Sequence, residues 1–452
     1  MRFVFIIMRL VPLSFLLLTA CSSGLRMDYA VKTQQEVEKV SAWSKLDGAQ
    51  QTTYLNELIG ATQLDQLLDE AMKANPGLQQ TLLTLKIRQA EYRQTNGSRL
   101  PTASAGFEAT KKEGNDAAYT GSAAISWEAD LWGKLATNST AAGKDVAQQQ
   151  ALYQSARDTL AAEVMTAWLG LIAQQRSINI EQRRLGTLSQ NEQFILQRYR
   201  KGLGTLEDLD SARSSVASSQ ATLEQYKEAL AQQKRSLRSL LGRSAHLDLD
   251  ILNDYPDVMI PLSDLPEQTL NRRPDLKAAY LAIEAADLRT SVAYKDLLPS
   301  ISLEAALTDV ADTPRQALFT NPVWSLLGQL TAPLFQGGQL KAAAEIAELE
   351  TASAYQAYRE TLLTAVTEVE NALGQECSLA KQQAHLEKAL ENSRNNLEQY
   401  RNSYRKGLTE ILDLLNVEQE TYDLEAQLDN LIYERLANRV SLGLALGLGV
   451  HL

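Results

Sequence analysis

The side chains that could carry catalysis or bind a metal are few and widely separated in this sequence. Its three histidines are His246, His385 and His451, and no two of them stand at a spacing that would bring metal ligands together. Neither a G-x-S-x-G nucleophile motif nor a glycine-rich phosphate loop occurs. We therefore expect no enzyme, no metal site and no cofactor.

One cysteine does stand in a reactive context. A positively charged start and the apolar residues 11–18 lead to the letters LTAC, which end at Cys21. This order is typical of a secretory signal peptide, residues 1–20, followed by a cysteine whose thiol is acylated, for instance with palmitate. Ser22, rather than an aspartate, comes next, which in bacterial lipoproteins implies sorting to the outer membrane. An ordinary signal peptide with an incidental cysteine is the alternative.

Composition narrows the class of protein. The formal net charge of −11 disfavours nucleic acid and anionic lipid surfaces as partners. With 23 glycines and 11 prolines in 452 residues, turn signals are sparse, as is typical of long helices. After the signal segment no stretch reaches the roughly 20 apolar residues of a membrane helix. Cys377 is the only cysteine besides Cys21, so we expect no intrachain disulfide.

The chain repeats itself. The letters YRKGL at Tyr199–Leu203 return at Tyr404–Leu408, an offset of 205 residues, and the Leu-Pro at 100–101 returns at 298–299. Each half runs in the same order: a helix, Leu-Pro, a middle section, a long helix, the YRKGL turn, a returning helix and Leu-Gly. Several landmarks keep this order, which favours a true internal repeat over chance similarity between helical segments.

The middle sections alternate between apolar and polar residues. Four runs share this pattern: residues 103–110, 122–131, 301–308 and 324–334. Each has about ten residues, apolar on one face and polar on the other, as strands of a membrane barrel require. A half-buried soluble sheet would alternate in the same way. The signal segment, Cys21 and the polar loops 111–120 and 309–322 favour the barrel.

The helices are long and the strands are few. Residues 142–200 contain no proline and would extend about 90 Å as one helix. On the helices alone a soluble coiled-coil hairpin would fit. Four strands cannot close a barrel, however, and open strand edges do not occur in lipid. We therefore expect an oligomer of two or three chains whose helices continue the barrel as a tunnel.

Taken together, these features resemble the TolC-like outer-membrane efflux family, above all its lipoprotein branch associated with RND-type pumps. The motifs that carry the resemblance are LTAC at 18–21, the two Leu-Pro strand starts, SWEADLWGKL from Ser126, LTAPLFQGGQL from Leu330 and the two YRKGL turns. It covers nearly the whole mature chain. It implies a mainly α fold with a transmembrane β-barrel and a long coiled-coil tunnel, closed only as a homotrimer.

The resemblance also implies the function. The chain would be the outer-membrane channel of a tripartite efflux system, a passive exit duct for small molecules delivered by an inner-membrane pump and a periplasmic adaptor. A similar duct for type I protein secretion stays open as an alternative. A lipid-anchored periplasmic coiled-coil adaptor is a further one, although it would need one helical hairpin inserted in small β-domains rather than two repeats.

In the family the two turns close the tunnel on the side of the pump. Gly202-Leu203 and Gly407-Leu408 match the motif that meets adaptor hairpins there. A glycine that ends a helix would explain the same letters without any partner. Both explanations can hold together.

The family also places a gate beside these turns. Asp208 and Tyr404 match positions that form a closing hydrogen bond, and Asp413 falls where the entrance carries an acidic ring. Asn416 stands where a second acid is common, and Thr409 stands near the place of an expected arginine, so both features of the gate are incomplete here. Solvated polar residues on a helix surface are the alternative.

The predicted organisation has five segments. They are the signal peptide at 1–20, a lipid-anchored segment at 21–60, a first repeat at 61–250 with strands at about 102–131 and its tip at 199–208, a linker at 251–270, and a second repeat at 271–452 with strands at about 300–335 and its tip at 404–413.

Overall fold

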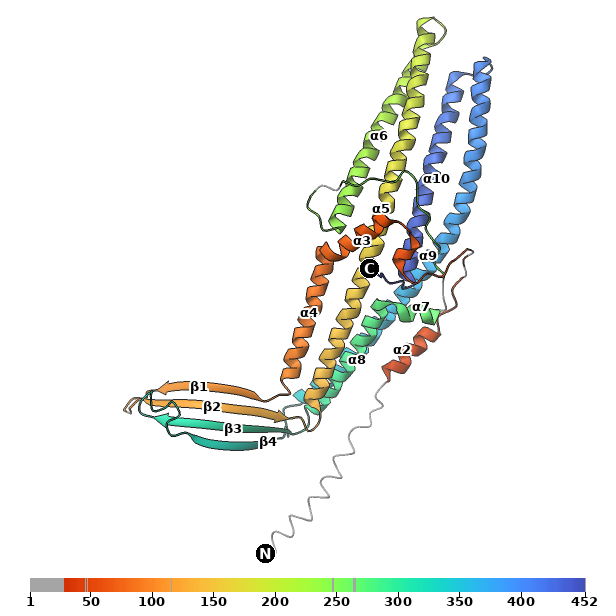
Figure 1. The fold of residues 1–452 in the computed structure, drawn as a ribbon. Helices are drawn as coiled ribbons and strands as arrows, with labels where there is room; N and C mark the ends of the chain where they lie inside the picture. The colour runs from red at the N-terminus through yellow and green to blue at the C-terminus, as the bar shows by residue number, and fades with distance from the viewer. Residues whose placement is uncertain are drawn as a thin grey trace.

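A computed structural model describes residues 28–451 of the protein except 45, 47, 115, 246–247 and 263–265. The expected signal peptide and Cys21 therefore lie outside the described residues. In the described part, long helices extend from a small four-stranded sheet at one end to two helical hairpins at the other (Figure 1). This confirms the predicted fold class.

The helices come in pairs of equal length. The first repeat holds α4 (Pro76–Gly97), α5 (Lys134–Arg200) and α6 (Leu206–Leu240), with 22, 67 and 35 residues. The second holds α8 (Pro274–Lys295), α9 (Gln339–Arg405) and α10 (Ile411–Ala445), again with 22, 67 and 35 residues. A proline at the first helical position opens α4 and α8, where its missing N–H costs nothing. At 1.5 Å per residue, α5 and α9 are each about 100 Å long.

The sheet is antiparallel and open. Its strands are β1 (Thr102–Thr110), β2 (Ala118–Ala129), β3 (Ser300–Ala311) and β4 (Val323–Thr331), in that spatial order. The register aligns the apolar positions in rows across the sheet, for example Ala105, Ala123, Leu307 and Trp324. One face is therefore apolar from strand to strand, as period-two alternation predicts.

Two strands end before the predicted limits, and local chemistry explains why. Asp130 follows β2 and accepts hydrogen bonds from the backbone N–H groups of Leu135 (3.0 Å) and Ala136 (2.8 Å), so it belongs to the start of α5. Pro333, just after β4, has no N–H to donate to a strand ladder.

The helices form a different row in each half of the molecule. Beside the sheet, α5 packs against α4 and α8, and α8 packs against α9. Toward the tips, α5 packs against α6 and α10, and α10 packs against α9 (Figure 1). The outer edges of the rows are therefore α4 and α9 near the sheet and α6 and α9 near the tips. Among the helices that the structure describes, none has the length and apolar character needed to cross a membrane.

A belt of short elements surrounds the middle of the helices. It contains α2 (Tyr29–Glu38), η1 (Leu55–Leu58), α3 (Thr62–Ala74) and α7 (Pro266–Arg272). The largest apolar core lies here, around Trp168 of α5, whose indole N–H donates to the Gln63 side chain at 2.9 Å. The C-terminal residues return to the same place, since the Leu55 N–H donates to the Gly449 carbonyl at 2.9 Å.

Candidate functional site

The two YRKGL turns have the same backbone structure. In the first, Gly202 has φ 72° and donates to the Tyr199 carbonyl at 2.9 Å, and Leu203 donates to the Arg198 carbonyl at 2.9 Å. In the second, Gly407 has φ 73°, and its bond and that of Leu408 repeat these distances at the matching positions. This is the Schellman ending of a helix, in which glycine avoids the strain that a Cβ would meet at positive φ. The repeated letters therefore have a structural reason.

The leucines after these glycines are not explained by the turn. A Schellman ending is usually accompanied by a hydrophobic contact back to the helix. Leu203 and Leu408 instead remain 63% and 73% exposed. The turns between α5 and α6 and between α9 and α10 lie at the end of the molecule farthest from the sheet (Figure 1), so both leucines are exposed at that end.

The two returning helices start differently. Thr205 caps α6: its side chain accepts from the Asp208 N–H at 3.1 Å, and the Asp208 carboxylate accepts from the Thr205 N–H at 3.1 Å. Hydrogen bonds with Thr205 hold the pKa of the Asp208 carboxyl below its ordinary value; the bond with the Thr205 side chain has the largest effect and the bond with its backbone the next largest. At the matching position of the second tip, Glu410 makes no such side-chain bond. Only the first tip has the reciprocal capping box.

Within the single chain that the structure describes, the expected hydrogen bond between Asp208 and Tyr404 is not formed. The Asp208 carboxylate accepts from the Thr205 N–H, and the Tyr404 hydroxyl accepts from Arg198 Nη1 at 2.9 Å. Arg198 also donates to the Leu203 carbonyl at 3.0 Å, and the Phe194 ring lies edge-on to Tyr404 with centroids 6.0 Å apart. The two tips of one chain do meet, but the contact runs through an arginine that the sequence did not single out.

Asp413 and Asn416 lie one turn apart on α10, and both side chains are exposed. Their neighbours Leu414 and Leu415 are buried in a small core that also holds Ile195 of α5. The exposed face could therefore present Asp413 to solvent or to other copies of the chain. The acidic ring itself needs those copies and stays a prediction.

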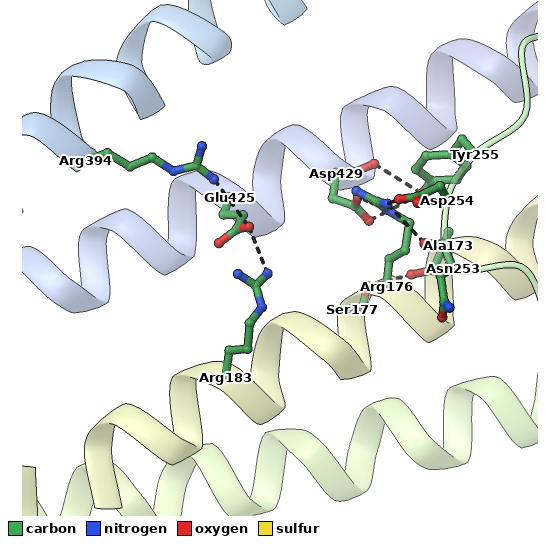
Figure 2. A network of polar contacts seen from close by, with 10 residues as sticks. All are labelled: Ala173, Arg176, Ser177, Arg183, Asn253, Asp254, Tyr255, Arg394, Glu425 and Asp429. Carbon is green, nitrogen blue, oxygen red and sulfur yellow. Dashed lines mark hydrogen bonds and ion pairs between the residues drawn. The ribbon is translucent and has the colours of Figure 1, made fainter. Parts of the chain in front are cut away.

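Farther from the tips, a polar network joins α5 to α10 and to the linker (Figure 2). Arg176 bonds Asp429 of α10 at 2.5 Å and Asp254 of the linker at 2.7 Å. Burial raises the pKa of Asp429, although its bond with Arg176 opposes that shift. The Tyr255 hydroxyl donates to the same carboxylate at 3.3 Å. Because removing one partner of a buried ion pair leaves a costly lone charge, Arg176 and Asp429 are expected to act as a unit.

A family model describes most of the chain. The model of the family described as outer membrane efflux protein matches residues 67–243 and 265–448. The two matched segments correspond to the two structural repeats, tips included.

Individual relatives match over similar lengths. The pyoverdine export outer membrane protein OpmQ of Pseudomonas putida is 28% identical over 407 residues, which cover 86% of this chain and 86% of OpmQ. The probable outer membrane lipoprotein SilC of Salmonella typhimurium is 24% identical over 430 residues, 93% of each chain. The open-state crystal structure of the Neisseria gonorrhoeae MtrE outer membrane channel superposes with a TM-score of 0.82 at 24% identity, covering 90% of this chain and 95% of that one. At this identity the last comparison concerns the fold.

The difference between the tips predicts a difference in local stability. Thr205→Ala should destabilise the first turn of α6 by about 1 kcal/mol, the usual effect of losing a cap. Hydrogen exchange of the amides after Leu206 should quicken, while exchange at the start of α10 should not change. Unchanged exchange at α6 would show that the cap does not hold this turn.

The same cap should respond to acid. Because the pKa of Asp208 is lowered in the folded tip, its contribution is complete above the ordinary Asp value of about 3.9 and is lost as the pH falls through the lowered value. Protection at the α6 start should therefore decrease in that range, and Asp208→Asn should remove the dependence.

Proposed function

The chain belongs to the outer membrane efflux protein family, and we propose that it is the passive exit duct of a tripartite pump. It is a channel protein of the cell outer membrane. Small molecules enter between the helical tips and leave through the barrel. An inner-membrane pump, of RND type, supplies the energy, and a periplasmic adaptor joins that pump to the tips.

The observation that carries the proposal is the pair of open edges on the sheet. Within the described chain, β1 and β4 each pair on one side only. The apolar face of the sheet contains exposed side chains such as Trp324 (76%) and Leu326 (72%), which suit lipid. A strand edge in lipid must pair with another strand, so the edges of one copy have to meet those of the next.

The helical edges fit the same arrangement. On α4, Leu83 and Ile87 are exposed, and on α9, Ile346 and Leu349 are exposed. These two helices are the outer members of the row beside the sheet, so α4 of one copy would meet α9 of the next. Three copies would give a barrel of twelve strands, within the range of known outer-membrane barrels, and we propose this homotrimer.

The tips would form the entrance and the docking surface. Leu203 and Leu408 are apolar and exposed, and each trimer would present six such side chains in a ring to the adaptor. Three Asp413 carboxylates, with Asn416 one turn farther along α10, would line the entrance and favour cations. The family match over both repeats favours this duct over a coiled-coil adaptor. The names of OpmQ and SilC refer to export and to an outer membrane lipoprotein, and neither refers to protein secretion.

Breaking the helical edge should prevent assembly. We expect Ile346→Glu with Leu349→Glu to reduce the trimer fraction strongly in detergent, because two charges would enter an apolar contact. Mass measurement by light scattering reports the result. Val31→Glu, at an exposed apolar residue of α2, is the matched control and should leave the trimer intact. A parent protein that is monomeric in mild detergent would contradict the duct itself.

Changing the tips should spare the channel and stop efflux. Leu203→Asp with Leu408→Asp should yield trimers that conduct like the parent in lipid bilayers. Cells that carry this variant should nonetheless be as sensitive as the deletion strain across a panel of compounds, because the adaptor no longer docks. Leu252→Asp, made alone at an exposed leucine of the linker, is the control and should leave resistance at the parent's level. Full resistance of the tip variant would refute docking at these leucines.

Lipidation at Cys21 is the third part of the proposal. Mass spectrometry of the mature protein should find Cys21 as the first residue, carrying acyl chains, and Cys21→Ser should abolish the modification. The barrel should still insert, because its apolar faces do not depend on the anchor. A mature protein that starts at an unmodified Ser22 would contradict this assignment.

A further inference from the structure

The connection between β3 and β4, residues 312–322, lies against the sheet; we call it the β3–β4 loop. Gly121 of β2 has no Cβ, and a Cβ built there would overlap the carbonyl oxygen of Ala317 in this loop. Ala317 is fully buried although it belongs to a loop. Glycine at this position of the strand therefore lets another part of the backbone come close.

A buried carboxylate holds the loop at a second point. Asp309 of β3 stands opposite Gly121 in the strand register and is only 4% exposed. Its Oδ2 accepts a hydrogen bond from the backbone N–H of Asn321, near the end of the loop, at 3.0 Å. Before this point the loop forms one turn of its own, since the Ala317 N–H donates to the Thr313 carbonyl at 3.2 Å. The loop thus has a defined position on the sheet.

The face of the sheet that the loop covers is the apolar one. On β2, Gly121 lies two residues from Ala123, so both positions point to the same side. On β3, Asp309 stands in the same relation to Leu307. Ala123 and Leu307 belong to the apolar row across the sheet, and Phe107 of β1, in register with Gly121, shares their face. In the proposed duct this face is turned toward lipid.

Asp309 would lie within the lipid-facing band of the barrel. It stands eight residues beyond Ile301, near the start of β3 on the apolar face. At about 3.3 Å per residue and a strand tilt of about 40°, this is roughly 20 Å along the barrel axis, whereas the apolar band of such barrels is about 25 Å tall. An ionised carboxylate is costly at this depth unless it is paired or covered. The loop supplies both a hydrogen-bond donor and a cover for it.

The loop also exposes apolar side chains of its own. Leu318 and Phe319 directly follow the buried Ala317 and are 64% and 42% exposed. Phe319 has φ 59°, and in the part of the chain that the structure describes it is the one residue other than glycine with positive φ. A bulky residue is strained in this conformation, and such strain persists where the surrounding contacts fix the backbone. The exposed pair is therefore held in place by the docked loop.

This apolar surface continues into the next strand. No charged residue occurs from Leu318 to Trp324, and Trp324 is 76% exposed on the apolar face of β4. The charged residues of the loop, Asp312 and Arg315, come before this run and are both exposed. Lipid head groups suit such residues, because an arginine can keep its guanidinium among them while its stem follows apolar surface.

We propose that the β3–β4 loop is fixed on the lipid side of the barrel wall and that Leu318 and Phe319 contact the acyl chains of the outer leaflet. Gly121 and Asp309 are the positioning residues, the first by leaving room for the loop backbone and the second by binding it. The inference rests on the proposed duct function, from which it takes the orientation of the barrel. A loop held on this side cannot fold into the lumen, so it leaves the outer exit of the duct unobstructed.

Fluorescence quenching measures whether the loop lies in lipid or in water. In a Cys21→Ser, Cys377→Ser background, Leu318→Cys is labelled with a small fluorophore, and the trimer is reconstituted in phosphatidylcholine vesicles with or without brominated acyl chains. We expect brominated lipid to lower the fluorescence several-fold and aqueous iodide to have little effect. Trp324→Cys, on the apolar face, is the reference for lipid, and Lys112→Cys, at an exposed residue between β1 and β2, is the reference for water.

Adding Gly121→Ala tests what holds the loop. The new Cβ would overlap the Ala317 carbonyl, so the loop should leave the sheet, and the fluorophore at Leu318 should respond to iodide rather than to brominated lipid. Gly328→Ala is the matched control, because Gly328 lies on the same face of β4 and its Cβ would make an ordinary contact of 3.5 Å. If the Gly121→Ala protein does not assemble, Asp309→Ala replaces it, and a smaller shift in the same direction is expected.

Three outcomes would count against these assignments. The proposal is overturned if the fluorophore at Leu318, without further substitution, responds like the one at Lys112. The positioning roles are overturned if Gly121→Ala, or Asp309→Ala in its place, leaves the response at Leu318 unchanged. If the fluorophore at Trp324 is also insensitive to brominated lipid, the sheet does not face lipid, and the proposed duct itself fails.

Discussion

An unpaired strand edge cannot remain in hydrocarbon, and the rest of this structure depends on that constraint. A backbone N–H or C=O group without a partner costs far more in lipid than in water, where it can bond to solvent. The four strands of one chain leave two such edges, at β1 and β4. In the proposed duct, each chain is therefore a segment of a larger cylinder. The long helices continue from these strands, so they have to follow the curvature of the barrel and contact the same neighbouring chains as the strands do.

The internal repeat meets this constraint with two unequal versions of one unit. Both units end their long helix in the same Schellman turn, because a sharp reversal needs glycine at positive φ. They differ in the return: Thr205 and Asp208 cap α6, whereas Glu410 leaves α10 without a side-chain cap. In the proposed duct, capped and uncapped hairpins would alternate around the entrance.

Local signals were enough to predict the strands, the turns and the helical class. Alternation with period two identified the strand faces that the register of Ala105, Ala123 and Leu307 places in one row. The glycines of the YRKGL turns were equally readable, because their role is decided within a few residues. The family resemblance indicated the efflux function, which no local pattern contains, and the proposed trimer rests on the same resemblance.

The contacts between distant segments were not predictable in this way. Tyr404 was expected to bond Asp208, but in the structure the Tyr404 hydroxyl accepts from Arg198 of α5, and Asp208 takes part in the capping box of α6. The belt is a stronger case. Leu55 bonds Gly449 from nearly the other end of the chain, and nothing in either neighbourhood indicates the other. The arginines of α5 that pair with α10, namely Arg176, Arg183 and Arg184, were visible in the sequence, but their partners Asp429, Glu425 and Asp423 were not.

The equal lengths of matching helices restrict how such a protein can change in evolution. Both tips must reach the same plane if they are to bound one opening, and that plane is set by the 67 and 35 residues of each hairpin. Deleting two turns from α5 and α6 alone would leave one wall of the cylinder about 10 Å short. Insertions and deletions should therefore be tolerated only when α5, α6, α9 and α10 all change by the same length. The helical part of the chain can then change length only in matched steps, whereas the loops between paired strands remain free of this constraint and can vary one residue at a time.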